Sequence, residues 1–435
     1  MKRELLTSGV SIGLLRMLGG LLAVVVTIVL GRHLGPSGLG IYAYAVTCLT
    51  LATVPVSYGW STLLLKTVSE NLHDEDWSQT KGLAIKGTHL ALLFAILLWI
   101  ILLAASVVAP HLLPEALTPL TLTVLVGILL CDQLSALRTA ILRGLDYPVI
   151  GQIPEMLVRP TALILGALLI FTVAGESTSV FHAFVALIAA AAVSVLVGQG
   201  LLWRKTPGAL SRASARFSTR AWLAIAAPIA ASSGLMVLNG YVDLLVLGSL
   251  GEVAQVGLYR VALQVGLVSG MAYTALNMLA NQRFAYLRAA GELAQTQTTA
   301  TFMARIALLC AIPIPIVLIL RGREIIAAVF GEAFIDALEP MVILALGQCL
   351  NAATGMARTL LIMSGQEKTV ALITVAAVLG NLLCCLVLIP RLGMSGAALA
   401  NLIAAGGLNL TLWAYARKVT DIDTSFIGLL GGRPS

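Results

Sequence analysis

The sequence predicts an all-α polytopic membrane protein, with about twelve transmembrane helices in two six-helix lobes around a central cavity. The first observation is its composition: of 435 residues, 59% are hydrophobic and only 11% are charged, and the mean hydropathy is +0.97. A soluble domain carries about 25% charged residues, so this chain has too few charges to cover a water-facing surface of its size. The second is the length of its apolar runs, such as 17–31 and 91–108. Lipid must therefore be the solvent for most of the chain.

Helices, not barrel strands, are expected to make the crossings. Barrel strands alternate polar and apolar residues over about ten positions, whereas these runs are continuously apolar. The runs between charged or Gly/Pro-containing turns predict twelve spans. They are 9–31, 38–64, 83–109, 117–141, 150–173, 179–203, 221–248, 255–282, 298–320, 334–362, 367–389 and 394–416. Most of them can cross a hydrocarbon core of about 30 Å at about 1.5 Å per residue.

The first span is predicted to be an uncleaved membrane helix. Its apolar run exceeds the core of a signal peptide, and no small-residue cleavage site follows it. The basic residues then set the orientation. With the N-terminus in the cytoplasm, 20 of the 27 Lys and Arg residues fall at cytoplasmic ends, 4 at the opposite ends and 3 inside spans. Arg138 and Arg143 are counted among the 20. This bias predicts that both termini are cytoplasmic.

The chain is predicted to divide at a basic segment between the sixth and seventh spans. This segment, 204–220, contains five Arg and Lys residues together with Pro, Gly and several Ser. The predicted organisation is an N-terminal six-helix lobe (1–203), a cytoplasmic basic linker (204–220), a C-terminal six-helix lobe (221–418) and a cytoplasmic tail (419–435). Topology signalling explains the charge of the linker, and a lipid-headgroup site is the alternative.

A weak internal repeat indicates that the two lobes are related. A Leu-Gly…Leu-Gly pattern followed by Gly, a hydrophobic residue and Tyr occurs at 30–42 and again at 247–259. Both copies lie between the first and second spans of a half. A second pair, 143–146 and 364–367, lies between the fourth and fifth spans. Two units of equal topology, related by an axis along the membrane normal, are typical of transporters that work by alternating access.

No constellation of catalytic residues is recognisable. The five His residues are scattered, the six Cys residues lie in apolar runs, and no glycine-rich phosphate loop with a Lys occurs. We therefore expect no enzyme activity, no metal and no cofactor. The positive charge lacks the interleaved aromatic residues of a nucleic-acid-binding stripe, so no nucleic-acid partner is expected.

Charged residues inside the spans are the strongest functional candidates, because a charge at the bilayer centre costs about 2.5–3.5 kcal/mol on insertion scales. Arg16 lies about 10 Å into the first span, where it could contact a substrate or snorkel to the headgroups. Glu155 and Arg159 are one turn apart in the fifth span, and Asp132 lies at similar depth in the fourth. These three could form a structural triad or take part in ion coupling.

Asp243 and Arg260 form the second group of candidates. They lie toward the outer ends of the seventh and eighth spans. They could pair as a lock across the short turn between these spans. Alternatively, Arg260 could bind the substrate and Asp243 could couple transport to an ion.

Three segments resemble the motifs of a known family. Residues 31–42, GRHLGPSGLGIY, resemble the first-turn signature R-x-L-G-P-x-x-x-G-x-Y of polysaccharide exporters of the O-antigen flippase type. Residues 57–70 resemble the family's glycine followed by a basic residue and a small-residue–Glu pair, with Lys66 where Arg is commoner. Residues 390–400, PRLGMSGAALA, match the pattern P-x-x-G-x-x-G-A-A-x-A. The chain is thus similar to the polysaccharide exporter family of the multidrug/oligosaccharidyl-lipid/polysaccharide exporter superfamily.

The resemblance implies a flippase that translocates undecaprenyl-pyrophosphate-linked oligosaccharide units across the bacterial cytoplasmic (inner) membrane by alternating access. Arg16, Arg159 and Arg260 would bind the substrate, because Arg matches phosphate oxygens in a bidentate way. Asp132, Glu155 and Asp243 would be ion-coupling or structural charges. Expected partners are the lipid-linked substrate, membrane lipid, and a polysaccharide polymerase and glycosyltransferases, with the chain itself a monomer.

Two alternatives are kept. A drug/cation antiporter of the same superfamily would need acidic residues in its cavity, so a net negative cavity favours the antiporter and a net positive one favours the flippase. A membrane glycosyltransferase or ligase would need an acid or base at the outer surface. Its only candidates there are Glu115, Glu176, Glu252 and the region 332–339.

Overall fold

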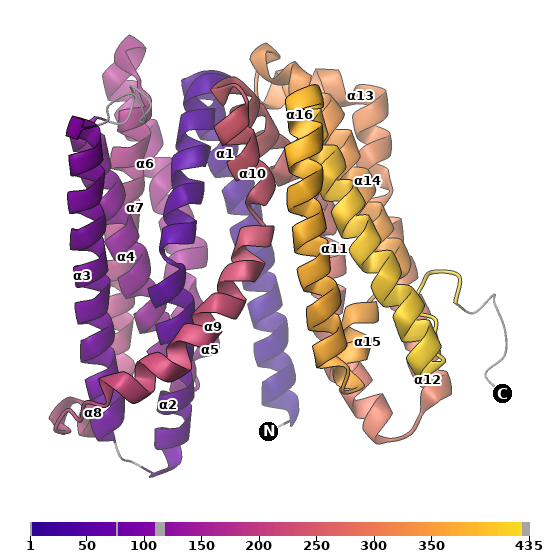
Figure 1. Ribbon diagram of the computed structural model, residues 1–435, viewed down its shortest axis with the longest axis horizontal. Helices are drawn as coiled ribbons and strands as arrows, with labels where there is room; N and C mark the ends of the chain where they lie inside the picture. The colour runs from indigo at the N-terminus through magenta and orange to yellow at the C-terminus, as the bar shows by residue number, and fades with distance from the viewer. Residues whose placement is uncertain (1, 75–76, 109–117, 429–435) are drawn as a thin grey trace. The chain divides into compact units, whose positions relative to one another are not determined.

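The structure is a computed structural model that describes the chain except residues 1, 75–76, 109–117 and 429–435 (Figure 1). The predicted turn with Glu115 and the end of the predicted tail therefore lie outside the described residues. The described residues form helices and no strand, which confirms the all-α prediction. The chain forms two compact units, of which unit 1 is Met1–Leu34 with Ile41–Gly240 and unit 2 is Gly35–Gly40 with Tyr241–Ser435.

Unit 1 contains most of α1 and the helices up to Gly240. Its elements are α1 (Lys2–Ala52), the π-helical segment η1 (Pro55–Trp60), α2 (Ser61–Asp74), α3 (Trp77–Val108), α4 (Pro119–Gly144), α5 (Pro148–Ile153), the π-helical segment η3 (Pro154–Val158), α6 (Arg159–Ala174), the 3₁₀ turn η4 (Gly175–Ser177), α7 (Val180–Lys205), α8 (Gly208–Arg212) and α9 (Thr219–Asn239).

Unit 2 contains the remaining helices. Its elements are α10 (Val242–Leu250), α11 (Val253–Ala289), α12 (Leu293–Ala311), α13 (Pro313–Val329), the 3₁₀ segment η5 (Glu332–Ala337), α14 (Leu338–Thr354), α15 (Ala357–Met363) and α16 (Glu367–Thr420). The predicted tenth span is thus broken within its length, because the chain takes a left-handed turn at Gly355 (φ 70°) between α14 and α15.

The number of crossings follows from the length of the helical runs. Within the described residues, ten runs are long and apolar enough to cross a membrane. Two of them, Ser11–Ala52 and Glu367–Thr420, have 42 and 54 residues, and a crossing needs about 20. Each contains a glycine with a positive φ, Gly35 (67°) and Gly393 (56°), where the sequence predicts a turn. Counting each as two spans gives the twelve predicted crossings.

The repeated glycine motif has a packing role within unit 2. Gly40, from the first copy, and Gly257, from the second, lie back to back. A Cβ atom on Gly40 would overlap the carbonyl oxygen of Val253, and one on Gly257 would overlap the carbonyl oxygen of Pro36. Any larger residue at either position would push these backbones apart, so both copies of the motif need a glycine here.

The core of unit 1 includes α9, although the sequence places residue 221 at the start of the second lobe. Trp222 of α9 packs edge-on against Trp60, with ring centroids 6.0 Å apart. Gly59 permits this approach, because a Cβ atom there would lie 2.7 Å from Cβ of Ala230. The compact units therefore divide at Gly240, and the boundaries of the two predicted six-helix lobes stay a prediction.

The described part of the predicted tail is docked in unit 2. Gln297 of α12 accepts from the backbone N–H of Asp423 and donates to its carbonyl oxygen, both at 2.7 Å. The Thr424 hydroxyl donates to the carbonyl oxygen of Thr354, the last residue of α14, at 2.8 Å. Carbonyl groups at a helix end lack partners within the helix, so this segment caps α14.

Candidate functional site

Unit 1 contains a cavity of about 330 Å³ that is lined mostly by polar and charged residues. Its wall comes from η1, α2, α4, α5, η3 and the first residue of α6, together with the residues just before η1. The lining residues are Thr53, Ser57, Tyr58, Ser61, Thr62, Leu65, Asp132, Ser135, Ala136, Thr139, Ala140, Arg143, Gln152, Glu155, Met156 and Arg159. Three of the six predicted site residues, Asp132, Glu155 and Arg159, thus line one cavity.

Both π-helical segments of the described chain face this cavity. Each begins with a proline, Pro55 in η1 and Pro154 in η3, which lacks the N–H needed for a regular helical hydrogen bond. The wider turns place Ser57 and Tyr58 on one side of the cavity and Glu155 and Met156 on another. Single π-helical turns within α-helices occur frequently at functional sites.

Four charged side chains form a connected network, and three of them, Asp132, Glu155 and Arg159, line the cavity. Arg159 Nη1 lies 2.6 Å from Asp132 Oδ1 and 3.2 Å from Glu155 Oε2. Arg138 Nη2 lies 3.5 Å from the other carboxylate oxygen of Glu155, which also accepts a hydrogen bond from Ser194 Oγ at 2.8 Å. The triad considered from the sequence is therefore formed, and Arg138 extends it to four residues.

Arg138 was not among the predicted site residues, because it was counted with the basic residues at the cytoplasmic helix ends. The side chain is buried, with 4% exposed, and its Nη1 donates to the carbonyl oxygen of Ser194 at 2.9 Å. Gly198 of α7 makes room for it, because a Cβ atom there would overlap the guanidinium group. The sequence does not distinguish a buried from an exposed arginine near the end of a span. Gly198 on the facing helix is the one sequence feature that could have indicated the burial of Arg138.

The network balances its own charge. Arg138 and Arg159 carry two positive charges, and Asp132 and Glu155 carry two negative ones. Neutralisation of this kind is what makes buried charges tolerable in a low-dielectric environment. The guanidinium of Arg159 is consequently engaged by two carboxylates, and it is poorly placed to act as an unpaired receptor for an anion.

Arg143 differs from the network residues. It lines the cavity from the C-terminal end of α4, eleven residues and about 16 Å along the helix from Asp132. Its side chain is exposed. Within the described residues, no ion pair or hydrogen bond of its guanidinium group is found. Arg143 is therefore the cation of this wall that can accept an anionic ligand.

The hydroxyl groups of the wall present mainly acceptor oxygens to the cavity. The hydroxyls of Ser61, Thr62 and Thr139 donate to the backbone carbonyl oxygens of Ser57, Tyr58 and Gly151, respectively. Their lone pairs remain available, as each hydroxyl has one donor and two acceptor sites. The oxygen of Ser57 is buried and has no hydrogen-bond partner among the described residues. Such a wall suits a ligand that brings hydroxyl donors.

Arg16 does not line this cavity. It is exposed on α1, one turn before Gly19. A Cβ atom on Gly19 would lie 3.1 Å from the carbonyl oxygen of Met156, which is a wall residue. Residues three apart lie on neighbouring parts of one helix face, so Arg16 is exposed next to the contact between α1 and Met156.

Of the two alternatives for Asp243 and Arg260, the pairing is not formed among the described residues of unit 2. Asp243 is buried on α10 and accepts a hydrogen bond from the Tyr259 hydroxyl at 2.5 Å. It also accepts from Asn401 Nδ2 at 3.3 Å and from the backbone N–H of Leu244 at 2.9 Å. Arg260 follows Tyr259 on α11 but lies on another face of that helix, since adjacent residues are about 100° apart.

Comparisons with known proteins now define the family. Residues 5–281, more than half of the chain, match a model of the family described as polysaccharide biosynthesis protein. The chain belongs to this family. No relative was found among curated protein sequences. Membership of the polysaccharide biosynthesis protein family confirms the family resemblance, and the match includes the first two sequence motifs, 31–42 and 57–70.

Several solved structures share the fold of this polysaccharide biosynthesis family member. An inward-facing multidrug resistance MATE family transporter of the MOP superfamily has a TM-score of 0.74 and 13% identity, over 93% of this chain and 94% of that one. The lipid II flippase MurJ in an inward closed conformation has a TM-score of 0.73 and 14% identity, over 94% and 87%. A MOP superfamily transporter from Pyrococcus furiosus has a TM-score of 0.62 and 14% identity, over 95% of both chains. The chain therefore shares the fold of these two transporters and of this flippase.

Proposed function

We propose that this chain is a flippase that moves undecaprenyl-pyrophosphate-linked oligosaccharide units across the bacterial inner membrane by alternating access. Membership of the polysaccharide biosynthesis protein family supports a role in handling glycans. The fold supports transport, because transporters and a lipid flippase share it. The predicted central cavity, the cytoplasmic termini and the absence of enzyme activity belong to this proposal.

The cavity of unit 1 is the observation that carries the proposal. Its hydroxyl-rich wall offers acceptors for sugar hydroxyls, and Arg143 offers a guanidinium group for a phosphate. At about 330 Å³, the cavity can hold only part of a lipid-linked oligosaccharide. We propose that a sugar phosphate portion of the headgroup enters it while the polyprenyl chain stays in the bilayer.

The predicted roles of the charged residues change in one respect. Because Asp132 and Glu155 already engage Arg159, we assign the anion contact in this cavity to Arg143 and give Arg159 the role of positioning the two carboxylates. Arg16 and Arg260 remain proposed substrate contacts outside this cavity. Asp243 remains a proposed ion-coupling residue, and the hydrogen bonds that it accepts from described residues come from neutral donors.

A drug/cation antiporter is the second candidate, and the charge of the cavity argues against it. The wall contains two arginines and two carboxylates, and Arg138 behind it pairs with one of these carboxylates. A site for organic cations would need an uncompensated acid, which this wall lacks among its described residues. A ligase or glycosyltransferase is disfavoured because the similar structures are transporters and a flippase.

The proposal can be tested by genetic complementation. In cells that lack the chromosomal gene, Arg143→Ala should restore surface polysaccharide about tenfold less well than the wild type, because one charge-assisted hydrogen bond is worth about 1.5–3 kcal/mol. Arg143→Lys should retain more export than Arg143→Ala, since it keeps the charge but loses the bidentate geometry. Lipid-linked units should accumulate inside the Arg143→Ala cells.

Arg323→Ala provides the matched control for this experiment. Arg323 is an exposed arginine of α13 in unit 2, so its loss removes the same charge without touching the cavity. Export should remain at the wild-type level. Full export by Arg143→Ala, or an equal loss in Arg323→Ala, would refute the assignment of Arg143.

A further inference from the structure

The linker between α7 and α9 is an ordered part of unit 1. The backbone N–H of Arg216 donates to the carbonyl oxygen of Ser78 at 3.0 Å, and Lys81 Nζ donates to the carbonyl oxygen of Ala213 at 2.9 Å. Gly82 permits the closest approach, because a Cβ atom there would overlap the carbonyl oxygen of Arg216. The first turns of α3 thus fix the linker in place.

The fixed linker presents cations and exposed aromatic residues together. Segment 204–220 contains five Arg and Lys residues and no acidic residue. Phe217 is 57% exposed, and Trp203, at the end of α7, is 75% exposed. Aromatic residues next to basic residues at the ends of membrane helices are typical of the bilayer interface.

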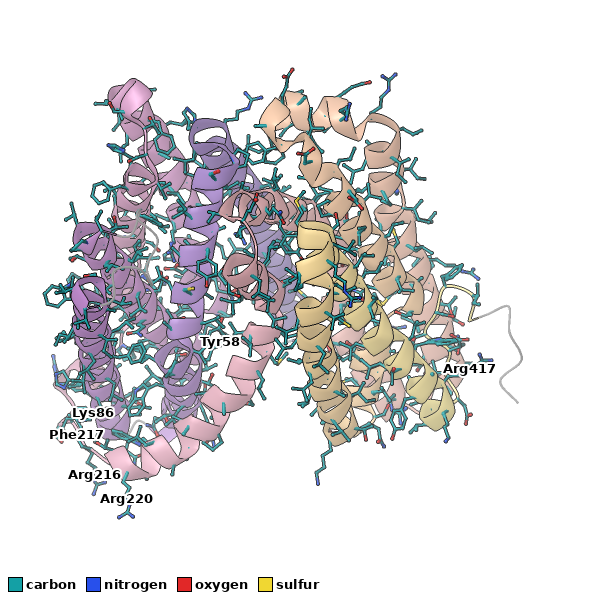
Figure 2. The ribbon with its side chains drawn as sticks, turned by 45° about the horizontal axis from the view of Figure 1, so that its top comes forward. Tyr58, Lys86, Arg216, Phe217, Arg220 and Arg417 are labelled. Atoms are coloured by element: carbon teal, nitrogen blue, oxygen red, sulfur yellow. The ribbon has the colours of Figure 1, made fainter. Side chains whose placement is uncertain are left out.

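Lys86 of α3 lies next to the linker. Lys86 lies one helical turn after Gly82, so it stands on the same helix face just above the point where the backbone of Arg216 touches α3. Figure 2 shows Lys86, Arg216, Phe217 and Arg220 gathered at one end of unit 1. We call these four residues the linker patch.

An apolar stripe continues from the linker patch along α3. Leu93, Leu97 and Ile100 follow Lys86 at intervals of 7, 11 and 14 residues, which places them on one helix face. All three are exposed, as expected for a surface in contact with acyl chains. Cations at a helix end followed by an exposed apolar stripe match the two parts of a phospholipid.

We propose that the linker patch is a binding site for an anionic phospholipid of the surrounding bilayer. Lys86, Arg216 and Arg220 hold the phosphate and the negatively charged headgroup, Phe217 enters the interface, and an acyl chain lies along the stripe of α3. The site is separate from the cavity and does not depend on the proposed transport function. The bound phospholipid holds the linker and the start of α9 at the membrane surface.

The site can be tested with the full-length protein by native mass spectrometry in detergent. Phosphatidylglycerol and phosphatidylethanolamine with identical acyl chains are titrated separately. The wild type should bind phosphatidylglycerol about tenfold more tightly than phosphatidylethanolamine, because each basic residue near a surface contributes to the attraction of anionic lipid. The triple variant Lys86→Gln/Arg216→Gln/Arg220→Gln should lose this preference, and Phe217→Ala should weaken binding of both lipids.

The matched control removes three exposed charges elsewhere. The variant Arg323→Gln/Lys368→Gln/Lys418→Gln has the same change in net charge, and all three residues lie in unit 2. It should keep the wild-type preference for phosphatidylglycerol, and the melting temperatures of both triple variants without lipid should show that they are folded. Retention of the preference in the linker-patch variant, or an equal loss in the control, would overturn the proposal.

Discussion

At the scale of single residues, the described wall of the cavity combines a balanced ion network with an arginine, Arg143, for which no ion pair is found among the described residues. Glu155 and Arg159 are one turn apart, and Asp132 comes from the neighbouring helix, so their association could be anticipated from sequence. The burial of Arg138 and the hydrogen-bond partner of Asp243 could not be anticipated from the sequence. Both depend on which helix faces meet, and hydropathy does not carry that information. The separation of roles between Arg143 and Arg159 follows only from these contacts.

The ion network gives a prediction about stability. In Arg159→Met, Asp132 loses its cation and Glu155 keeps only Arg138, so the protein should be clearly less stable. Adding Asp132→Asn should recover part of the loss, with a coupling energy of about 1–3 kcal/mol in a double-mutant cycle. Thermal unfolding of the purified protein in detergent measures each variant.

The control for this cycle is the pair Arg321–Glu324. These side chains also form an ion pair, at 2.7 Å, but both are about two-thirds exposed. The cycle Arg321→Met/Glu324→Gln should give a coupling of about 0–0.5 kcal/mol. Equal coupling energies for the two pairs would mean that the cavity network is no stronger than a surface contact.

At the scale of elements, irregular segments carry most of what the sequence did not predict. The turns at Gly35 and Gly393 were predicted, because each lies in a glycine motif between two apolar runs. The π-helical segments that form part of the cavity wall were not predicted. Hydropathy averaged over a window does not change when a helical turn contains one extra residue. The docking of the tail was also missed, as a short segment after the last span offers no periodic pattern.

The docked tail gives a prediction about pH. Burial alone would raise the pKa of Asp423, but hydrogen bonds from Ser425 and Trp413 and the nearby Arg417 guanidinium hold it below its usual range. A carboxyl group with a lowered pKa stabilises the fold above its unfolded pKa of about 3.9, and this contribution is lost as pH falls through the folded pKa. Asp423→Asn should therefore lower the melting temperature at pH 7, and its difference from the wild type should shrink below about pH 4.

Asp421→Asn is the control for the tail. Asp421 is exposed, two residues away, and has a left-handed backbone conformation that Asn also adopts. Its melting temperature should follow that of the wild type across the same pH range. A difference for Asp423→Asn that is constant with pH would show that the charge of Asp423 does not hold the tail.

At the scale of the whole molecule, composition and the spacing of apolar runs were enough to predict the membrane fold. The twelve crossings were recovered from ten helical runs, and the family resemblance was confirmed by the match over residues 5–281. The position of α9 was not anticipated, because its packing against η1 depends on Gly59 and Trp222 and not on hydrophobicity. Function at this scale depends on whether the chain moves a lipid-linked glycan.

A transport assay with the purified protein in liposomes tests most directly whether the chain moves a lipid-linked glycan. Lipid-linked oligosaccharides extracted from cells lacking the gene are placed in liposomes with the purified protein, and the fraction accessible to an external glycan-cleaving enzyme is followed over time. The wild-type protein should make the inner pool accessible, and Arg143→Ala should slow this about tenfold. Access no faster than in protein-free liposomes, together with uptake of an organic cation by the same vesicles, would contradict the flippase and favour the antiporter.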